Sequence, residues 1–123
     1  MILVDTSVWI DHLRSGDAAL ADRLNRSQVL THPFVLGEIA LGNLANRATV
    51  LGALAGLPTI TVASDAEALA FIDAAPLHGL GIGHIDAHLL AAVRLTPGAI
   101  LWTRDRRLGA AAAGVGVLVL SGV

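Results

Sequence analysis

The chain has 123 residues, enough for one domain, and its 54% hydrophobic content with only 3% aromatic residues predicts a core of small aliphatic side chains. Eight arginines and ten acidic residues give a net charge of −2, which is compatible with RNA binding without arguing for it, and the lack of cysteine excludes a disulfide framework. The start has no basic segment typical of a signal peptide, and the longest uncharged stretches, 48–64 and 108–123, are too short and too glycine-interrupted to span a membrane. We therefore expect a cytoplasmic protein, and the apolar excess predicts an oligomer.

Short apolar runs typical of buried strands alternate with longer segments that have helical periodicity. The predicted strands cover residues 2–4, 29–31, 59–62, 100–102 and 117–120, and the predicted helices cover 8–14, 18–25, 34–44, 48–54, 65–74, 85–95 and 106–112. Asp17 is a predicted helix N-cap, and Ser64 with Glu67 forms a predicted capping box. This alternation predicts one α/β domain, residues 1–123, with a central, mostly parallel sheet covered by helices on both faces.

Four acidic residues occupy positions where such a chain tolerates charge least. Two of them follow strand-like runs, and the other two interrupt helix-like apolar stretches. A buried carboxylate without a partner is strongly disfavoured, so these residues need a cation or a dense set of donors. We therefore predict that all four converge on bound metal. They are Asp5 after residues 2–4, Glu38 within 34–44, Asp86 within 85–95 and Asp105 after 100–103.

Helical periodicity places the two mid-helix acids on apolar faces. At about 100° per residue, Asp86 shares its face with three aliphatic residues of its own helix. A solvated acid shows the opposite pattern. Capping also explains Asp5 or Asp86 taken alone, and a turn explains Asp105, but a mid-helix Glu38 needs no cap. The residues within roughly 60° of Glu38 are Phe34, Val35, Leu41, Gly42 and Ala45.

Four sequence segments around these acids occur in a recognisable order. They read DTSVWID at residues 5–11, LGEIA at 36–40, IDAHLLA at 85–91 and WTRDRRL at 102–108. With these segments the chain resembles the PIN-domain nucleases, and closely resembles the VapC toxins of bacterial toxin–antitoxin pairs. The resemblance runs from residue 1 to about residue 120. Each segment alone is weak evidence, but four in order with compatible spacing are specific.

The resemblance implies a PIN-like three-layer α/β/α fold and an Mg²⁺-dependent endoribonuclease, with Mn²⁺ as a substitute, that inhibits translation. It also implies a homodimer, and neutralisation by a VapB-type antitoxin in a hetero-oligomer. In the family pattern the four acids match Asp5, Glu38, Asp86 and Asp105. Thr103 matches a hydroxyl residue two before the last acid.

The residue types fit that chemistry, because Mg²⁺ prefers oxygen ligands and promotes phosphodiester hydrolysis. We assign Asp5, Asp86 and Asp105 to direct metal binding, and Glu38 to metal binding or to orienting the attacking water. Thr6 and Thr103 are expected to position a ligand or water. One-metal and two-metal arrangements both remain compatible with this set.

Arginine and histidine side chains near the acids extend the predicted site. Arg104, Arg106 and Arg107 flank Asp105 and are predicted to contact the RNA backbone, since arginine binds phosphate in a bidentate manner. The alternative for them is a solvated basic helix face. Arg14 is a further predicted RNA contact.

His84 and His88 are spaced four apart, as in zinc-binding helices. The glutamate of the zinc protease motif is missing, and Asp86 points about 160–200° away from both. We therefore expect solvent-facing, capping or interface histidines.

Two other functions are weighed against the nuclease. A phosphoreceiver-type metal-binding domain requires an acceptor aspartate after a middle strand and a lysine near the last one, and this chain contains no lysine. A PIN-like module that binds RNA without cleaving it has the same sequence features, so a cleavage assay with and without Mg²⁺ separates the two.

Overall fold

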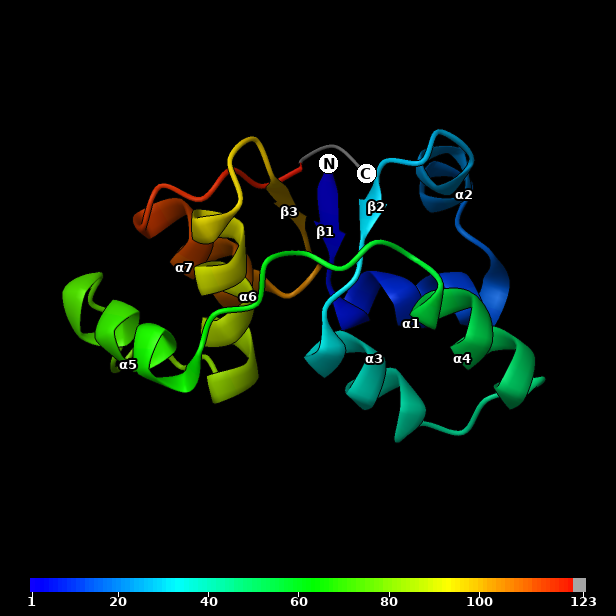
Figure 1. Ribbon diagram of the computed structural model, residues 1–123, viewed down its shortest axis with the longest axis horizontal. Helices are drawn as coiled ribbons and strands as arrows, with labels where there is room; N and C mark the ends of the chain where they lie inside the picture. The colour runs from blue at the N-terminus through cyan, green and yellow to red at the C-terminus, as the bar shows by residue number, and fades with distance from the viewer. Residues whose placement is uncertain (121–123) are drawn as a thin grey trace.

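Three short strands form a parallel sheet at the centre of the computed structural model, which describes residues 1–120 (Figure 1). The strand order is β2 (Val29–Leu30), β1 (Ile2–Val4), β3 (Ile100–Trp102). Ile2 is aligned with Val29 on one side and with Ile100 on the other. All three strands therefore end at the same edge of the sheet.

The central strand β1 has the burial pattern that is typical of a parallel sheet with protein on both faces. All three of its side chains are buried, as expected for a strand with protein on both faces. Its neighbour β3 contributes Leu101 and Trp102, which are also buried. Fully burying a side chain of this size stabilises the fold by about 1.5–3 kcal/mol. The sheet is thus a well-packed base for the residues that directly follow its strands.

Helices flank the sheet in two groups (Figure 1). One group, α1 to α4, lies on the β2 side in this view, and the other, α5 to α7, lies on the β3 side. The helices of the described chain are α1 (Thr6–Ser15), α2 (Ala18–Asn25), α3 (Pro33–Ala40), α4 (Arg47–Ala55), α5 (Asp65–Ala74), α6 (His84–Leu95) and α7 (Arg106–Gly114). The predicted α/β class with a parallel, helix-flanked sheet is confirmed.

Local sequence signals set several helix starts correctly. The Asp17 side chain accepts a hydrogen bond from the Leu20 amide at the start of α2. At the start of α5, the Ser64 hydroxyl accepts from the Glu67 amide, and the Glu67 carboxylate accepts from the Ser64 amide. Both predicted caps are therefore confirmed.

Two of the predicted strands are reduced to single bridges. Thr59 pairs only with Thr31, beside β2, and Val119 pairs only with Leu101, beside β3. Both segments lie at the outer edges of the sheet, where a strand has one partner and fewer hydrogen bonds. Leu118 is also exposed, so the second segment lacks the continuous burial seen in β1. The predicted strands 59–62 and 117–120 were therefore too long.

The predicted helix 34–44 ends four residues early. The helix α3 stops at Ala40, and the Gly42 amide bonds to the Ile39 carbonyl in a tight terminal turn. Leu41 is 90% exposed, so it does not belong to the apolar stripe around Glu38 that an unbroken helix predicts. Within residues 1–120, no helix is both long and apolar enough to cross a membrane.

Candidate active site

The four predicted acids all lie at the edge of the sheet where the parallel strands end. Asp5 follows β1 directly, and Asp105 follows β3 by three residues at the N-cap position of α7. Glu38 lies in α3, which follows β2, and Asp86 is the third residue of α6. Ligand sites in open parallel sheets form at this edge, because loops and helix starts meet there.

Asp5 is buried, with 5% exposure, and its carboxylate is held from two sides. Its Oδ2 accepts hydrogen bonds from the Ser7 hydroxyl at 2.7 Å and from the Thr103 hydroxyl at 2.8 Å. Asp5 occupies the N-cap position of α1, yet its side chain makes no capping hydrogen bond. Its carboxylate is therefore held between the Ser7 side chain in the first turn of α1 and Thr103 just after β3.

Glu38 is joined to the same region through α1. The Thr6 hydroxyl donates to Glu38 Oε1 at 2.9 Å, across 32 residues of sequence. Glu38 itself is only partly buried. Thr6 thus contacts Glu38, and its predicted role in positioning a ligand or water stays a prediction.

The pKa of Asp86 depends on its burial and on the charges of the other three acids. Burial raises the pKa of Asp86 above its ordinary value, and the negative charges of Asp5, Asp105 and Glu38 raise it further. A hydrogen bond from the Gly83 backbone acts in the opposite direction, but the net pKa is still raised. Asp86 therefore lies within electrostatic range of the other three acids, although no three of the four bring ligand oxygens within 4.8 Å of one another among residues 1–120. We call these four residues the acid cluster.

Asp105 uses one oxygen of its carboxylate as a helix cap and leaves the other oxygen unused by the cap. Its Oδ1 accepts from the Arg107 and Leu108 amides and so caps α7. Such a cap is worth about 1 kcal/mol, which means that the capping explanation accounts for part of this residue. Both capping bonds use Oδ1, and this geometry leaves Oδ2 available to a cation. Asp105 is thus an exposed helix cap, not a buried acid, and its charge also acts on Asp86.

The acid cluster has no positive side chain of its own among residues 1–120. None of its four carboxylates forms an ion pair with a described arginine or histidine. Arg104, one of the two arginines adjacent to Asp105 in sequence, is directed elsewhere. Its guanidinium donates to Asp11 and Asp17 and lies 5.7 Å from the centre of the Trp102 ring. Arg104 is therefore engaged in the fold, which weakens its predicted contact with RNA.

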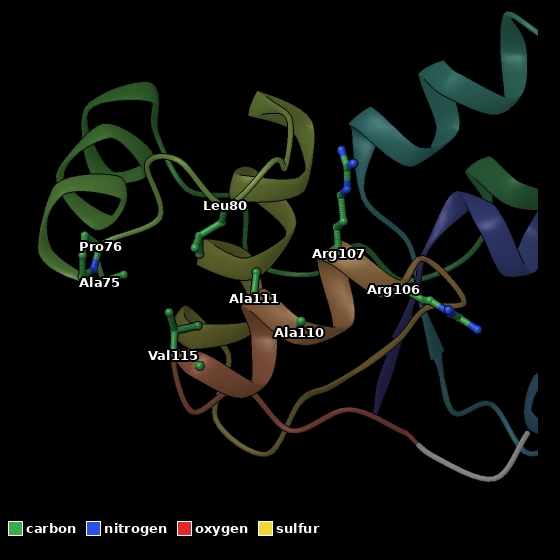
Figure 2. Close-up of a pocket in the computed structure, with 9 residues that line it drawn as sticks. Ala75, Pro76, Leu80, Arg106, Arg107, Ala110, Ala111 and Val115 are labelled. Atoms are coloured by element: carbon green, nitrogen blue, oxygen red, sulfur yellow. The ribbon is translucent and has the colours of Figure 1, made fainter.

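The other predicted RNA contacts are exposed. Arg106 and Arg107 begin α7, and Arg14 lies near the end of α1. Figure 2 shows Arg106 and Arg107 at one end of a cavity of about 510 Å³, with their side chains directed away from its apolar end. Ala75, Pro76, Leu80 and Val115 line that apolar end (Figure 2). The arginines are thus free to reach a ligand outside the cavity.

Ser7 is a site residue that was not predicted from the sequence. Its hydroxyl donates to Asp5 Oδ2 and accepts from the Arg104 amide at 3.0 Å, which joins the start of α1 to the end of β3. The available signal was a hydroxyl two residues after a strand-end aspartate, a spacing that favours local side-chain hydrogen bonds. Thr103, which was predicted, donates to the same oxygen and accepts from the Asp105 amide.

The histidine pair on α6 differs from its prediction. His84 is exposed, but His88 is 1% exposed and lies inside the helix, so it is neither solvent-facing nor a cap. His88 packs edge-on against Phe34, with ring centres 4.9 Å apart. The prediction failed for His88 because the ring of Phe34, distant in sequence, packs against it, a tertiary contact that helical periodicity does not contain.

Comparison with known proteins identifies the family. A model of the PIN domain matches residues 2–114, and the chain therefore belongs to the PIN-domain family. The predicted resemblance is confirmed, and the phosphoreceiver alternative is wrong. The chain is also similar to Ribonuclease VapC32 of Mycobacterium tuberculosis, from strains CDC 1551 and H37Rv. The identity to each is 49% over 117 residues, covering 95% of this chain and 94% of each relative.

The donor set fits the divalent ion that PIN nucleases require. Carboxylate oxygens are the preferred ligands of hard cations such as Mg²⁺. Burial and the neighbouring charges of Asp5, Asp105 and Glu38 raise the pKa of Asp86, and a bound cation would compensate that charge. Ser7 and Thr103 fix one oxygen of Asp5 and direct the carboxylate into the cluster. These residues are therefore suited to hold a metal ion.

Proposed function

We propose that this chain is a metal-dependent endoribonuclease that hydrolyses RNA phosphodiester bonds and inhibits translation as the toxin of a toxin–antitoxin pair. The observation that carries the proposal is the acid cluster: hydroxyl groups hold the Asp5 and Glu38 carboxylates, and none of the four acids forms an ion pair among residues 1–120. Burial and, secondarily, the charges of Asp5, Asp105 and Glu38 raise the pKa of Asp86. Membership of the PIN family and 49% identity to a VapC ribonuclease support the same activity.

Asp5, Asp86 and Asp105 would hold the ion, and we propose that it is Mg²⁺, with Mn²⁺ as a substitute. When bound, a divalent ion lowers the pKa of an attacking water and neutralises charge on the phosphodiester. Imidazole does not contribute to the acid cluster, and an all-oxygen donor set favours Mg²⁺ or Mn²⁺ over Zn²⁺.

The remaining residues of the cluster position the reactants. Glu38, held by Thr6 at 2.9 Å, is placed to orient the attacking water or to accept its proton. Ser7 and Thr103 hold the Asp5 carboxylate in one orientation through two short hydrogen bonds. Attack of the water oxygen on phosphorus forms one P–O bond and breaks the bond to the leaving oxygen, which takes up a proton.

RNA would approach along the exposed arginines beside the cluster. Arg106 and Arg107 precede the buried part of α7 and are not paired with acids among residues 1–120. Arg14 is the third proposed phosphate contact. Arg104 contributes less directly, because Asp11 and Asp17 already bind its guanidinium. An RNA substrate would put the site of action in the cytoplasm.

A VapB-type antitoxin would use an apolar groove next to Glu38. A cavity of about 430 Å³ lies between α1, α3 and α4, lined by Ile10, Leu13 and Leu44 together with Arg14 and Glu38. An amphipathic segment fits such a groove. A basic side chain on it would reach Glu38 and could substitute for metal charge at the cluster.

A homodimer would cover further apolar surface. Leu69 on α5 and Leu118 near the end of the described chain are both exposed, as is Leu95 at the end of α6. Burying such side chains against a second copy removes them from water. Light scattering on the antitoxin-free protein at micromolar concentration should give the mass of two chains, and a monomer mass would contradict the dimer.

Cleavage of RNA by the purified chain is the test of the proposed activity. The chain should cut RNA in Mg²⁺ and stop when the ion is chelated, with activity restored by added Mg²⁺ or Mn²⁺. RNA binding without cleavage in Mg²⁺ would show instead a non-cleaving module of the same fold.

A further inference from the structure

A second group of possible metal ligands lies at the junction of α5 and α6. One ligand atom from each of Asp65, His84 and His88 lies within 4.8 Å of the other two. Nε2 of His88 is 3.4 Å from Oδ1 of Asp65, and the ring centres of His84 and His88 are 4.6 Å apart. Two residues along a helix correspond to about 200°. The histidines therefore face away from Asp86 and from the acid cluster.

His88 is the residue in this group that the fold alone does not explain. It is 1% exposed, and neither of its ring nitrogens has a hydrogen-bond partner among residues 1–120. A buried polar group without a partner costs stability, because it loses its hydrogen bonds to water. Phe34 packs against the ring of His88 but offers it no hydrogen bond. A ligand at Nε2 would satisfy this nitrogen.

Asp65 is also not needed to cap its own helix. It is the first residue of α5, but the start of that helix is already capped by the reciprocal hydrogen bonds of Ser64 and Glu67. Its side chain is 93% exposed, and it still lies beside the buried His88. An ion pair with so exposed a carboxylate contributes little by itself. The position of Asp65 therefore fits a ligand better than a structural partner.

We propose that Asp65, His84 and His88 bind one transition-metal ion, with Zn²⁺ the best fit, at a site separate from the acid cluster. Zinc bonds to imidazole nitrogen and carboxylate oxygen are about 2.0–2.2 Å long, so neighbouring ligand atoms in a tetrahedral site lie roughly 3.4 Å apart. The separation between His88 and Asp65 already has this value. Two imidazoles with one carboxylate favour Zn²⁺ over Mg²⁺ or Ca²⁺.

The consequence of such a site would be structural. The ion would join the first residue of α5 to the first turn of α6, which also carries Asp86 on its other face. Residue 85 is isoleucine and not the glutamate of a zinc protease, so no general base stands beside the pair. Three protein ligands leave the fourth position to water. The site would thus fix the helix that presents Asp86.

Zinc titration of the full-length chain without an affinity tag tests the proposal. Calorimetry in excess Mg²⁺ should show one Zn²⁺ per chain. Asp65→Asn and His84→Gln should each weaken zinc binding by at least about tenfold, and the double variant should not bind measurably. Both residues are exposed, so these variants keep the fold, which circular dichroism can verify. Zinc should also raise the melting temperature of the wild type and not that of the double variant.

Matched variants separate this site from the surface and from the acid cluster. Asp73→Asn on α5 and His78→Gln in the following loop change exposed residues of the same types and should leave zinc affinity unchanged. Asp86→Asn should also keep it, although this variant is expected to lose RNA cleavage. Wild type that does not bind zinc would overturn the proposal, as would a double variant that binds like the wild type. Loss of zinc binding in Asp86→Asn would do the same, because zinc would then occupy the acid cluster.

Discussion

The acid cluster and the group formed by Asp11, Asp17 and Arg104 are both built from carboxylates, but their charges are balanced in different ways. In the second group, hydrogen bonds from Arg104 lower the pKa of Asp17 below its ordinary value. In the acid cluster, burial and neighbouring negative charge raise the pKa of Asp86. Adjacent residues serve the two groups, since Arg104 binds Asp11 and Asp17 while Asp105 faces the cluster.

This difference separates carboxylates that stabilise the fold through ion pairs from carboxylates that we propose to bind metal. A protein-supplied cation beside the acid cluster would satisfy its charge and occupy the place of a metal ion. Arg104, which precedes Asp105 directly, is paired with Asp11 and Asp17 instead. The folded chain therefore retains uncompensated negative charge at one edge of its sheet, as expected for a site that binds an external cation.

Loss of one acid from the cluster should have the largest effect. Asp5→Asn or Asp86→Asn should reduce RNA cleavage in Mg²⁺ by at least about 100-fold, the typical cost of removing one charge-stabilising group from an active site. Both variants should also relieve growth inhibition on expression. Asp17→Asn, the matched change in the ion-paired group, should cleave at close to the wild-type rate. Full activity of Asp86→Asn would remove the basis for the metal assignment.

Metal addition should stabilise the wild type selectively. A ligand at 100 times its dissociation constant raises the free energy of unfolding by about 2.7 kcal/mol when it binds only the folded state. Thermal melts with chelator and with Mg²⁺ should show this gain in the wild type and in Asp17→Asn, and a smaller gain in Asp86→Asn. Equal gains in all three proteins would place the Mg²⁺ site outside the acid cluster.

Without metal, the order of stability should reverse. A raised pKa means that folded Asp86 binds its proton more tightly than the unfolded chain does, so this contribution stabilises at low pH and is lost as pH rises through the raised value. In chelator, Asp86→Asn should therefore melt above the wild type at neutral pH, because the amide carries no charge for the other three acids to repel. The difference in melting temperature should shrink on acidification. A variant that melts below the wild type at neutral pH would argue for a purely structural aspartate.

The stability contributed by the ion-paired group, Asp11, Asp17 and Arg104, should depend on pH in the opposite direction and more weakly. The lowered pKa of Asp17 gives stability that is present above its ordinary value of 3.8 and is lost as pH falls through the folded value. Asp17→Asn keeps a residue that caps helices well, so it isolates the charge. It should cost about 0.2–1 kcal/mol at neutral pH, as for other exposed ion pairs. Urea unfolding at neutral and acidic pH measures this, and a stabilised Asp17→Asn would contradict the pairing.

The sequence predicted the acid cluster because its signal is local. Each acid sits beside or within an apolar run, and the alternation of strands and helices brings the strand ends together. The Asp17 and Ser64 caps were predicted for the same reason, since a cap depends on three or four consecutive residues.

Features that depend on tertiary contact were not predictable. The pairing of Arg104 with Asp11 and Asp17 spans about 90 residues, and the burial of His88 involves its contact with Phe34 in α3. The outer strands were overpredicted because their apolar composition does not reveal that they lie at the sheet edges. The role of Ser7 required knowing that the end of β3 lies beside the start of α1.

Paramagnetic Mn²⁺ measures most directly whether the acid cluster binds the cation. Added in small amounts to isotopically labelled protein, it broadens the NMR signals of nuclei close to where it binds. The amide signals around Asp5, Asp86 and Asp105 should broaden first, those of Asp11 and Asp17 should persist longer, and excess Mg²⁺ should restore the lost signals. Asp86→Asn should need more Mn²⁺ for the same effect. Broadening that begins around Asp11 and Asp17, or that is unchanged in Asp86→Asn, would contradict the account.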